Sequence, residues 1–236
     1  MRLGKLITVE GTDGSGKGSL LNRLEKALRD IGHDVLRSRE PGDSNVGEVL
    51  RDMMFKNPGS APRSDGIVPL SGAQVDCLML CDHIGHVNHV ILPALKQGKW
   101  ILSDRYADSQ FAYCAAREHS DHINEAFWKH YGPMPDITIL LVGDVKEMLR
   151  RAKHRDESPN AKEPGKQAAK SWSKVEMQTR IQNAYLHNLS NQPRTIIVEV
   201  TGKTKEQVFE DAFERMFIKL AQRPKVTQPT IFETVQ

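Results

Sequence analysis

A glycine-rich turn near the amino terminus carries the residue types that bind a polyphosphate. Gly11, Gly14 and Gly16 are followed by Lys17, in the spacing G-x-x-x-x-G-K. Glycines let the backbone wrap closely and direct consecutive N–H groups at phosphate oxygens, and the lysine adds a positive charge. An apolar β-rich run precedes the turn, and leucines at helical spacing follow it. The sequence therefore predicts a phosphate-binding loop between a strand and a helix.

The residue after the lysine departs from the usual loop pattern. Ser or Thr commonly stands there and binds Mg²⁺ through its hydroxyl, whereas this chain has Gly18 and places Ser19 one position later. Either Ser19 reaches the ion, or the nucleotide, waters and carboxylates hold it, since Mg²⁺ usually keeps several waters. We favour the second arrangement. A glycine-rich turn that binds nothing is the alternative to both.

The size and charge of the chain limit the classes of function. A length of 236 residues suits one domain, which we place at residues 1–222, followed by an extended tail at 223–236. The net charge of +3 and the pI near 8.7 are only mildly basic. We therefore expect small anionic ligands rather than a nucleic acid.

Cysteine usage and hydropathy indicate a soluble, cytoplasmic protein. The three cysteines are odd in number and form no zinc-binding pattern, so we interpret Cys77 and Cys81 as buried thiols and predict no disulfide framework. The longest apolar run, at 137–142, is too short to span a membrane, and no cleavable signal pattern is present. We expect no membrane partner.

Apolar β-rich runs alternate with helical patterns along the chain. The predicted strands are 3–9, 33–38, 100–103, 137–142 and 195–200. The predicted helices are 19–30, 46–55, 74–97, 124–130, 145–155, 174–188 and 204–222. This alternation is typical of an α/β protein in which a five-stranded parallel sheet carries helices on both faces.

The segments after the predicted strands are where ligands of an open parallel sheet collect. Polar candidates follow all five strands, at 11–19, 39–42, 104–113, 143–144 and 201–204. The segment 153–173 is rich in Lys, Pro, Gly and Ser and is predicted to be a mobile surface loop.

Three motifs in order along the chain resemble those of the thymidylate kinase family. They are the loop 11–17 with an acid at Asp13, the sequence Arg-Glu-Pro-Gly at 39–42 followed by Gly47, Glu48 and Arg51, and Asp104-Arg105-Tyr106 followed by Ser109, Ala112 and Tyr113. The resemblance covers nearly the whole chain. It implies a P-loop NTPase fold with a mobile lid, and transfer of the ATP γ-phosphoryl group to dTMP for dTTP and DNA synthesis, with Mg²⁺ as cofactor.

The resemblance also implies roles for individual residues. ATP would contact Gly11, Asp13, Gly14, Ser15, Gly16, Lys17, Gly18, Ser19, Thr201, Gly202 and Lys203. The acceptor nucleotide would contact Asp13, Glu40, Pro41, Arg51, Met79, His83, Arg105, Ser109 and Tyr113, and a cis peptide at Pro41 is expected. Asp104 and Ser19 are the candidate Mg²⁺ ligands. Catalysis would use Lys17, Asp13 and Arg105 together with lid cations.

These roles agree with the chemistry of phosphoryl transfer. Two polyanions must be held together, and the planar fork of arginine suits a phosphate dianion, as implied for Arg51 and Arg105. Alternatives exist: Arg51 as an exposed helix charge, Asp104 as a helix cap or partner of Arg105, and Tyr113 as an ordinary half-buried tyrosine. The family places Tyr113 beneath the sugar, where it would favour deoxyribose.

The predicted lid, at about 150–173, resembles that of the mostly bacterial members of the family. The phosphate loop has Gly14 and Ser15 where other members carry an arginine, so lid cations would stabilise the transferred group. Arg151, Lys153 and Arg155 lie at the family's basic positions, and which of them acts stays open. A solvated helix face is the alternative for each.

The predicted base pocket departs from the family pattern. Met79 and His83 stand where an aromatic residue and an arginine are common, and Gly85 and Cys114 replace glutamines. Acceptors other than dTMP, such as a 5-modified dUMP or another pyrimidine deoxynucleotide, therefore stay open, although we favour dTMP. A nucleotide-binding module disabled by Gly18 is the alternative from another class. The resemblance also implies a homodimer, while a core helix would explain the same apolar faces.

Overall fold

A single parallel sheet organises the part of the chain that the computed structural model describes, residues 4–42, 44–51, 72–117, 132–156 and 175–222. The strands are β1 (Lys5–Gly11), β2 (Val35–Arg39), β3 (Trp100–Asp104), β4 (Ile137–Val142) and β5 (Thr195–Glu199). Their order is β2-β3-β1-β4-β5, and all neighbouring pairs are parallel. The predicted α/β class and five-stranded parallel sheet are confirmed.

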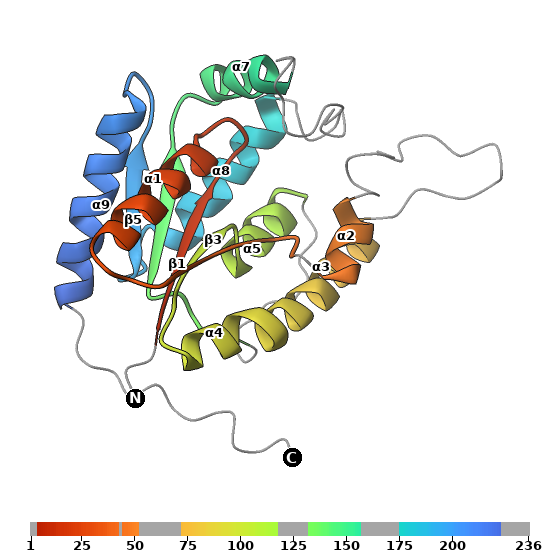
Figure 1. The fold of residues 1–236 in the computed structure, drawn as a ribbon. Helices are drawn as coiled ribbons and strands as arrows, with labels where there is room; N and C mark the ends of the chain where they lie inside the picture. The colour runs from red at the N-terminus through yellow and green to blue at the C-terminus, as the bar shows by residue number, and fades with distance from the viewer. Residues whose placement is uncertain (1–3, 43, 52–71, 118–131, 157–174, 223–236) are drawn as a thin grey trace.

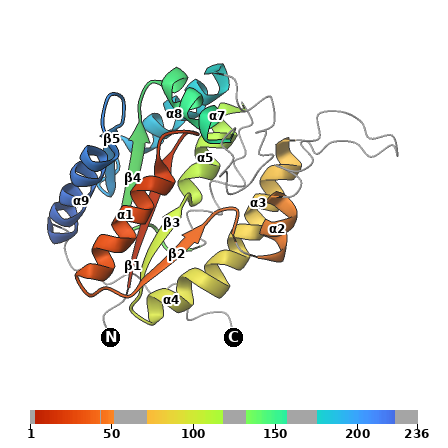
Figure 2. The same ribbon diagram turned by 45° about the horizontal axis from the view of Figure 1, so that its top comes forward.

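Helices cover both faces of this sheet, as predicted (Figure 1). They are α1 (Lys17–Asp30), α2 (Asn45–Arg51), α3 (Gly72–His86), α4 (Leu92–Lys96), α5 (Ala107–Ala116), α7 (Val145–Asp156), α8 (Val175–Leu189) and α9 (Lys205–Gln222). Figure 2 shows α1 and α9 together on one side of the sheet and α3, α4 and α5 on the other. The carboxyl ends of the strands therefore lie between two helical layers.

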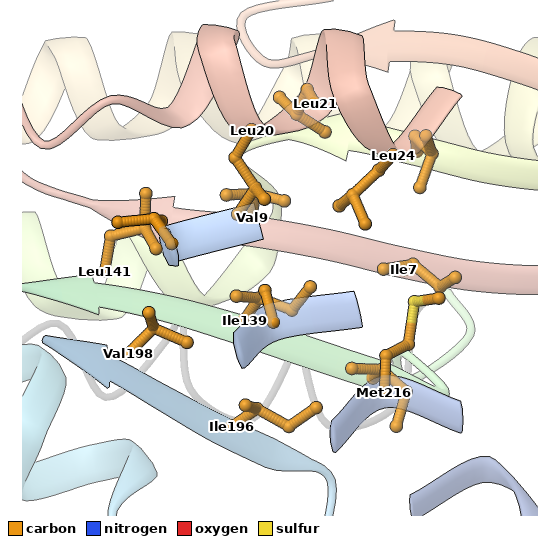
Figure 3. Close-up of a cluster of buried hydrophobic side chains, with 14 of the residues drawn as sticks. Ile7, Val9, Leu20, Leu21, Leu24, Ile139, Leu141, Ile196, Val198 and Met216 are labelled. Carbon is orange, nitrogen blue, oxygen red and sulfur yellow. The ribbon is translucent and has the colours of Figure 1, made fainter. Parts of the chain in front are cut away.

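Alternation along the strands builds these layers, because successive side chains point to opposite faces. Ile7 and Val9 of β1 pack with α1 and α9, whereas Leu6, the residue before Ile7, faces α4. The α1–α9 layer is a continuous apolar cluster, in which Leu24 and Met216 approach the sheet from the two helices (Figure 3). The cluster fixes where β1 ends and α1 begins, and so positions the phosphate loop.

The prediction of one continuous α-helix at 74–97 is wrong. A π-helical turn, Val87–Ile91, separates α3 from α4, and the amide of Leu92 donates to the carbonyl of Val87. Pro93 follows at the start of α4. A proline ring clashes with the carbonyl four residues earlier, and a widened turn makes room for it.

Other predicted elements differ less. The structure has helix α5 where the sequence predicts only a polar segment after β3, because the residues of α5 are buried on several sides and show no single apolar stripe. The predicted helix at 124–130, the lid beyond residue 156 and the tail at 223–236 lie outside the described residues. The described beginning of the lid, 150–156, is the end of α7.

The prediction of buried thiols on α3 is wrong. Cys77 and Cys81 are exposed, whereas Cys114 on α5 is buried; all three are free. The α3 residues that face the core lie at other positions of the helix, so its weak apolar periodicity gave no reliable orientation. None of the described helices combines the length and apolar character that crossing a membrane requires.

Candidate active site

The phosphate loop joins β1 to α1 through glycines in conformations that favour this residue. Gly11, Gly14 and Gly16 have φ angles of 138°, 77° and 96°. A Cβ atom on Gly14 would lie 1.8 Å from the carbonyl oxygen of Met148, so the loop also packs closely against α7. Larger residues would be strained at these positions. The sequence pattern therefore reflects both backbone shape and packing.

Lys17 is buried at the start of α1 and folds back over this loop. Its ammonium group donates to the carbonyl oxygens of Gly11 at 2.9 Å and Thr12 at 3.0 Å. Burial lowers the pKa of Lys17 to about 8, with a further contribution from the charge of Arg105, while the charge of Asp104 opposes the change. The side chain remains mostly protonated at neutral pH, as a phosphate-binding cation requires.

Arg105 follows β3 in a left-handed backbone conformation, with φ of 72°. Such a conformation is uncommon for a residue other than glycine and is concentrated at functional sites. The guanidinium donates to Asp13 Oδ1 at 3.1 Å, Ser109 Oγ at 3.3 Å and Tyr185 Oη at 3.2 Å, and lies 5.2 Å from the ring centre of Tyr113. The structure thus brings together four predicted site residues from two parts of the chain, Asp13, Arg105, Ser109 and Tyr113, and adds Tyr185 from α8.

Glu10 lies beneath this group, at the end of β1. Its fully buried carboxylate accepts hydrogen bonds from the Tyr106 amide at 2.9 Å, the Ser109 hydroxyl at 2.6 Å and the Tyr185 hydroxyl at 3.1 Å. Burial raises the pKa of Glu10 to about 8, and the charge of Asp108 adds to this effect. The motifs did not single out this acid.

Asp104, at the carboxyl end of β3, has the properties of a Mg²⁺ ligand. Its Oδ1 atom is buried and makes no hydrogen bond to the described residues. One protein carboxylate is enough to bind Mg²⁺ beside a nucleotide, because the ion keeps several waters and uses the nucleotide phosphates as further ligands. Around Gly18 a Cβ atom would meet no atom within 4 Å, and Ser19 lies next to it at partial exposure. In the described ranges no three His, Cys, Asp or Glu side chains form a metal cluster.

The Arg-Glu-Pro-Gly segment after β2 is held by side chains of α2 and α3. The Glu40–Pro41 peptide is cis, as expected. Arg51 Nη1 donates to the carbonyl oxygen of Pro41 at 2.7 Å and to that of Gly42, and Asp82 accepts from the Gly42 amide at 2.5 Å. In this structure Arg51 therefore shapes the segment from which Glu40 projects.

Glu40 is joined to two histidines of α3. Its Oε1 atom lies 2.6 Å from His83 Nδ1 and 3.0 Å from His86 Nδ1. Burial would raise the pKa of Glu40, but the electrostatic attraction of His83 and the hydrogen bonds of both imidazoles outweigh it and lower the pKa to about 2. The His83 ring also packs against Tyr106, with 4.8 Å between centroids, so the Glu40 group borders the Arg105 turn.

Glu40 should therefore contribute to stability against acid. A folded-state pKa lowered from 4.5 to about 2 means that the contribution is complete above pH 4.5 and is lost as the pH falls through about 2. Over this interval the wild type should lose on the order of 3 kcal/mol more free energy of unfolding than Glu40→Gln. Denaturant titrations at several pH values measure this. The exposed Glu48→Gln should follow the wild type, and equal losses in Glu40→Gln would contradict the prediction.

A second buried polar group lies between α3 and α5. The fully buried Asp76 accepts hydrogen bonds from Gln110 Nε2 at 3.1 Å and from Arg117 Nη2. Burial and Asp76 raise the pKa of Cys114 to about 11, so this cysteine is a thiol at neutral pH. Met79 is half-buried on the same helix as Asp76.

The predicted lid cations and the adenine-binding loop lie on α7 and after β5. Arg151 Nη2 pairs with Glu147 within α7, and Lys153 and Arg155 are exposed near its end. The hydroxyl of Thr201 accepts from the Asp144 amide at 2.8 Å. Gly202 has a positive φ, and Lys203 forms an ion pair with Asp211.

Comparison with known proteins decides the family. A family model described as "Thymidylate kinase" matches residues 9–212, which is most of the chain. The chain is 35% identical to the thymidylate kinase of Nitratidesulfovibrio vulgaris over 216 residues, 87% of this chain and 92% of that protein. The chain belongs to the thymidylate kinase family. It is also 34% identical to the thymidylate kinase of Leifsonia xyli over 209 residues, 87% of this chain and 91% of that one.

A solved thymidylate kinase from Candida albicans has the same fold. It aligns with a TM-score of 0.70 at 22% identity and covers 92% of each chain. Family membership confirms the resemblance seen in the three motifs and the assignment as an ATP-dependent nucleoside monophosphate kinase. The roles of individual residues in this thymidylate kinase family member stay predictions.

Sequence reasoning missed Glu10 and Gln178, and the family resemblance implied for Tyr185 only its place on the helix that follows the lid. Glu10 lies near the end of an apolar strand, directly before the phosphate loop. Asp104 is a candidate because it is an acid at the end of such a strand, and the same criterion would have identified Glu10. Gln178 Oε1 accepts from the Asp13 amide at 3.3 Å, and Tyr185 lies two turns further along α8. No sequence signal fixed which side of α8 faces the loop, so only the fold reveals this pair.

Proposed function

We propose that ATP binds the phosphate loop while dTMP binds against Arg105 and the segment 39–42, and that an oxygen of the dTMP phosphate attacks the γ-phosphorus with release of ADP. The observation that carries this proposal is Arg105, whose guanidinium is held in a left-handed turn by Asp13 and two hydroxyls. Positioning and charge stabilisation account for most of the catalysis of phosphoryl transfer.

Each predicted residue then has a physical task. Lys17 and the loop amides offset the charge of the ATP phosphates. Arg105 binds the acceptor phosphate, Tyr113 packs beneath the sugar, and Asp13 binds the 3′-hydroxyl while orienting Arg105. Arg51 orders the acceptor segment through its carbonyl oxygens. Thr201, Gly202 and Lys203 would line the adenine.

Asp104 is the residue we propose as the Mg²⁺ ligand, directly or through water. Mg²⁺ bound with ATP would neutralise phosphate charge at the transferred group. The Oδ1 atom of Asp104 is buried and makes no hydrogen bond within the described part of the chain, which supports this assignment, and the charge of Asp104 acts on both Lys17 and Arg105. Ser19 is the alternative ligand from the loop.

Several finer features complete the proposal. Arg151, Lys153 and Arg155 would bring positive charge to the transferred phosphoryl group from a lid at about 150–173, as in the family members without a loop arginine. We also propose a single domain over 1–222, a homodimer and a cytoplasmic location. The base pocket would take dTMP between Met79 and His83.

Acceptor choice is tested by a substrate panel. Purified protein is supplied with Mg-ATP and with dTMP, dUMP, dCMP or a 5-modified dUMP, and ADP release is coupled to a spectrophotometric readout. The proposal expects the highest kcat/KM for dTMP. Faster turnover of a 5-modified dUMP would mean that this nucleotide, and not dTMP, is the acceptor. If no phosphate is transferred to any of them, the protein is a nucleotide-binding module.

Restoring a hydroxyl after Lys17 should strengthen Mg²⁺ use. Because a side chain at Gly18 meets open space, Gly18→Ser should fold normally and supply the ligand that the loop lacks. We expect the half-saturating Mg²⁺ concentration to fall by about threefold to tenfold, the effect of one added ligand. Titration of Mg²⁺ at fixed ATP measures this.

Gly18→Ala is the matched control, since it adds the same Cβ without an oxygen. It should keep the Mg²⁺ dependence of the wild type. If both variants behave alike, the hydroxyl does not reach the ion. Ser19→Ala distinguishes the two ligand arrangements, because it should weaken Mg²⁺ use only if Ser19 is the ligand.

A further inference from the structure

Asp76 on α3 is a fully buried acid to which neither the motifs nor the proposed transfer assigns a task. Its Oδ1 atom forms an ion pair with Arg117 and accepts a hydrogen bond from Gln110 Nε2 at 3.1 Å. Its Oδ2 atom is buried and accepts no hydrogen bond from the residues that the structure describes. A buried carboxylate oxygen without a donor costs free energy, and a ligand that donates to Oδ2 would offset this cost.

Two side chains of the neighbouring segment fix the orientation of this carboxylate. Arg117 has only donors, and Gln110 must turn its NH₂ group toward Asp76, because an ionised carboxylate only accepts. The same NH₂ group lies 3.4 Å from Cys114 Sγ, so both of its hydrogens have partners. Gln110 therefore has no hydrogen left to donate to a ligand, and Asp76 Oδ2 is an acceptor.

The proposed acceptor site leads to this carboxylate. Arg105 would bind the phosphate, and the ring of Tyr113, 5.2 Å away, would pack beneath the sugar. Gln110 lies one helical turn before Tyr113 on α5, and Met79 lies one turn after Asp76 on α3. The two helices lie side by side on one face of the sheet (Figure 2). A base joined to that sugar would therefore meet the contact between α3 and α5.

The edge of a pyrimidine base distinguishes donors from acceptors at one atom. Thymine and uracil carry a hydrogen on N3, whereas the N3 atom of cytosine carries a lone pair. A carboxylate oxygen accepts from the first kind of base and repels the lone pair of the second. A site built to accept from a substrate N–H strongly rejects an analogue that lacks it.

We propose that Asp76 is a specificity-determining residue, whose Oδ2 atom accepts a hydrogen bond from N3–H of the acceptor base. Arg117 and Gln110 act as positioning residues, because they hold the other oxygen. The inference rests on the proposed function and narrows its substrate class. dTMP and the 5-modified forms of dUMP all carry N3–H and would be accepted, whereas cytosine nucleotides would be rejected.

The test compares dTMP with 5-methyl-dCMP as acceptors. The two nucleotides share the methyl group and the shape of the base and differ at N3 and at the group on C4. Wild type should prefer dTMP. In Asp76→Asn the amide oxygen must face Arg117, so the NH₂ group takes the place of Oδ2 and donates to N3 of cytosine. The ratio of kcat/KM for dTMP to that for 5-methyl-dCMP should fall about tenfold or more.

Asp108→Asn is the matched control. Asp108 on α5 is also buried and ion-paired, but Arg194 and Thr138 donate to its two oxygens, so neither is left for a base. Any loss of activity in this variant should be equal for both nucleotides, and their ratio should stay that of the wild type. If Asp76→Asn also keeps the wild-type ratio, the inference is wrong.

A second variant covers a failure to fold. If Asp76→Asn is unfolded in a thermal melt, Asp76→Asn combined with Arg117→Gln replaces it, since removing both charges leaves no unpaired ion in the core. The same fall in the ratio is expected, and an unchanged ratio overturns the inference. If wild type phosphorylates neither nucleotide, the proposed function itself fails. If wild type phosphorylates both equally, the function stands and the role of Asp76 is wrong.

Discussion

Arg105→Ala should lower kcat/KM for dTMP by about 10³-fold or more, because the acceptor phosphate would lose a bidentate cation held by Asp13, Ser109 and Tyr185. The KM for dTMP should change more than the KM for ATP. Arg105→Lys should recover only part of it, because an ammonium cannot match the planar fork. Initial rates with each substrate varied in turn measure both effects.

The control for this loss is an arginine that pairs with no residue assigned to the site. Arg29 on α1 has a side chain that is 48% exposed and pairs with Glu25. Arg29→Ala should leave the kinetic constants of the wild type unchanged. If Arg105→Ala keeps the wild-type kcat/KM and circular dichroism shows an intact fold, Arg105 takes no part in the reaction.

Lys17→Ala should lower kcat by about 10³-fold or more, because the ATP phosphates would lose the buried cation of the loop. The wild type should also lose kcat/KM for ATP as the pH rises through about 8, where the ammonium of Lys17 loses its proton. The variant should lack this alkaline decline. The pH profile at saturating dTMP measures both expectations.

Lys26→Ala on the same helix is the control for Lys17. Its side chain is 78% exposed and forms an ion pair with Asp30, so its removal should leave both the rate and the pH profile unchanged. If kcat/KM for ATP still falls at alkaline pH in Lys17→Ala, a group other than Lys17 causes the decline. Wild-type turnover in that variant would contradict the role of the loop lysine.

The sequence by itself determined the class of fold and the chemistry. Alternating apolar runs and helical patterns predicted the five-stranded parallel sheet, because strand and helix periodicities follow from local backbone geometry. The spacing of Gly11, Gly16 and Lys17 predicted the phosphate loop, and the motif at Asp104 and Arg105 predicted the acceptor side. Such motifs are local, since the backbone turn and the side chains that use it are close in sequence.

Only the tertiary structure decided which side chains meet. Glu10, Ser109 and Tyr185 come from β1, α5 and α8, and no local pattern places their oxygens within 3.1 Å of one another. The orientation of α3 was likewise wrong from sequence, which placed Cys77 inside although it is exposed. The burial of a helix face and the pKa of a buried acid depend on neighbours distant in sequence, and packing alone determines those neighbours.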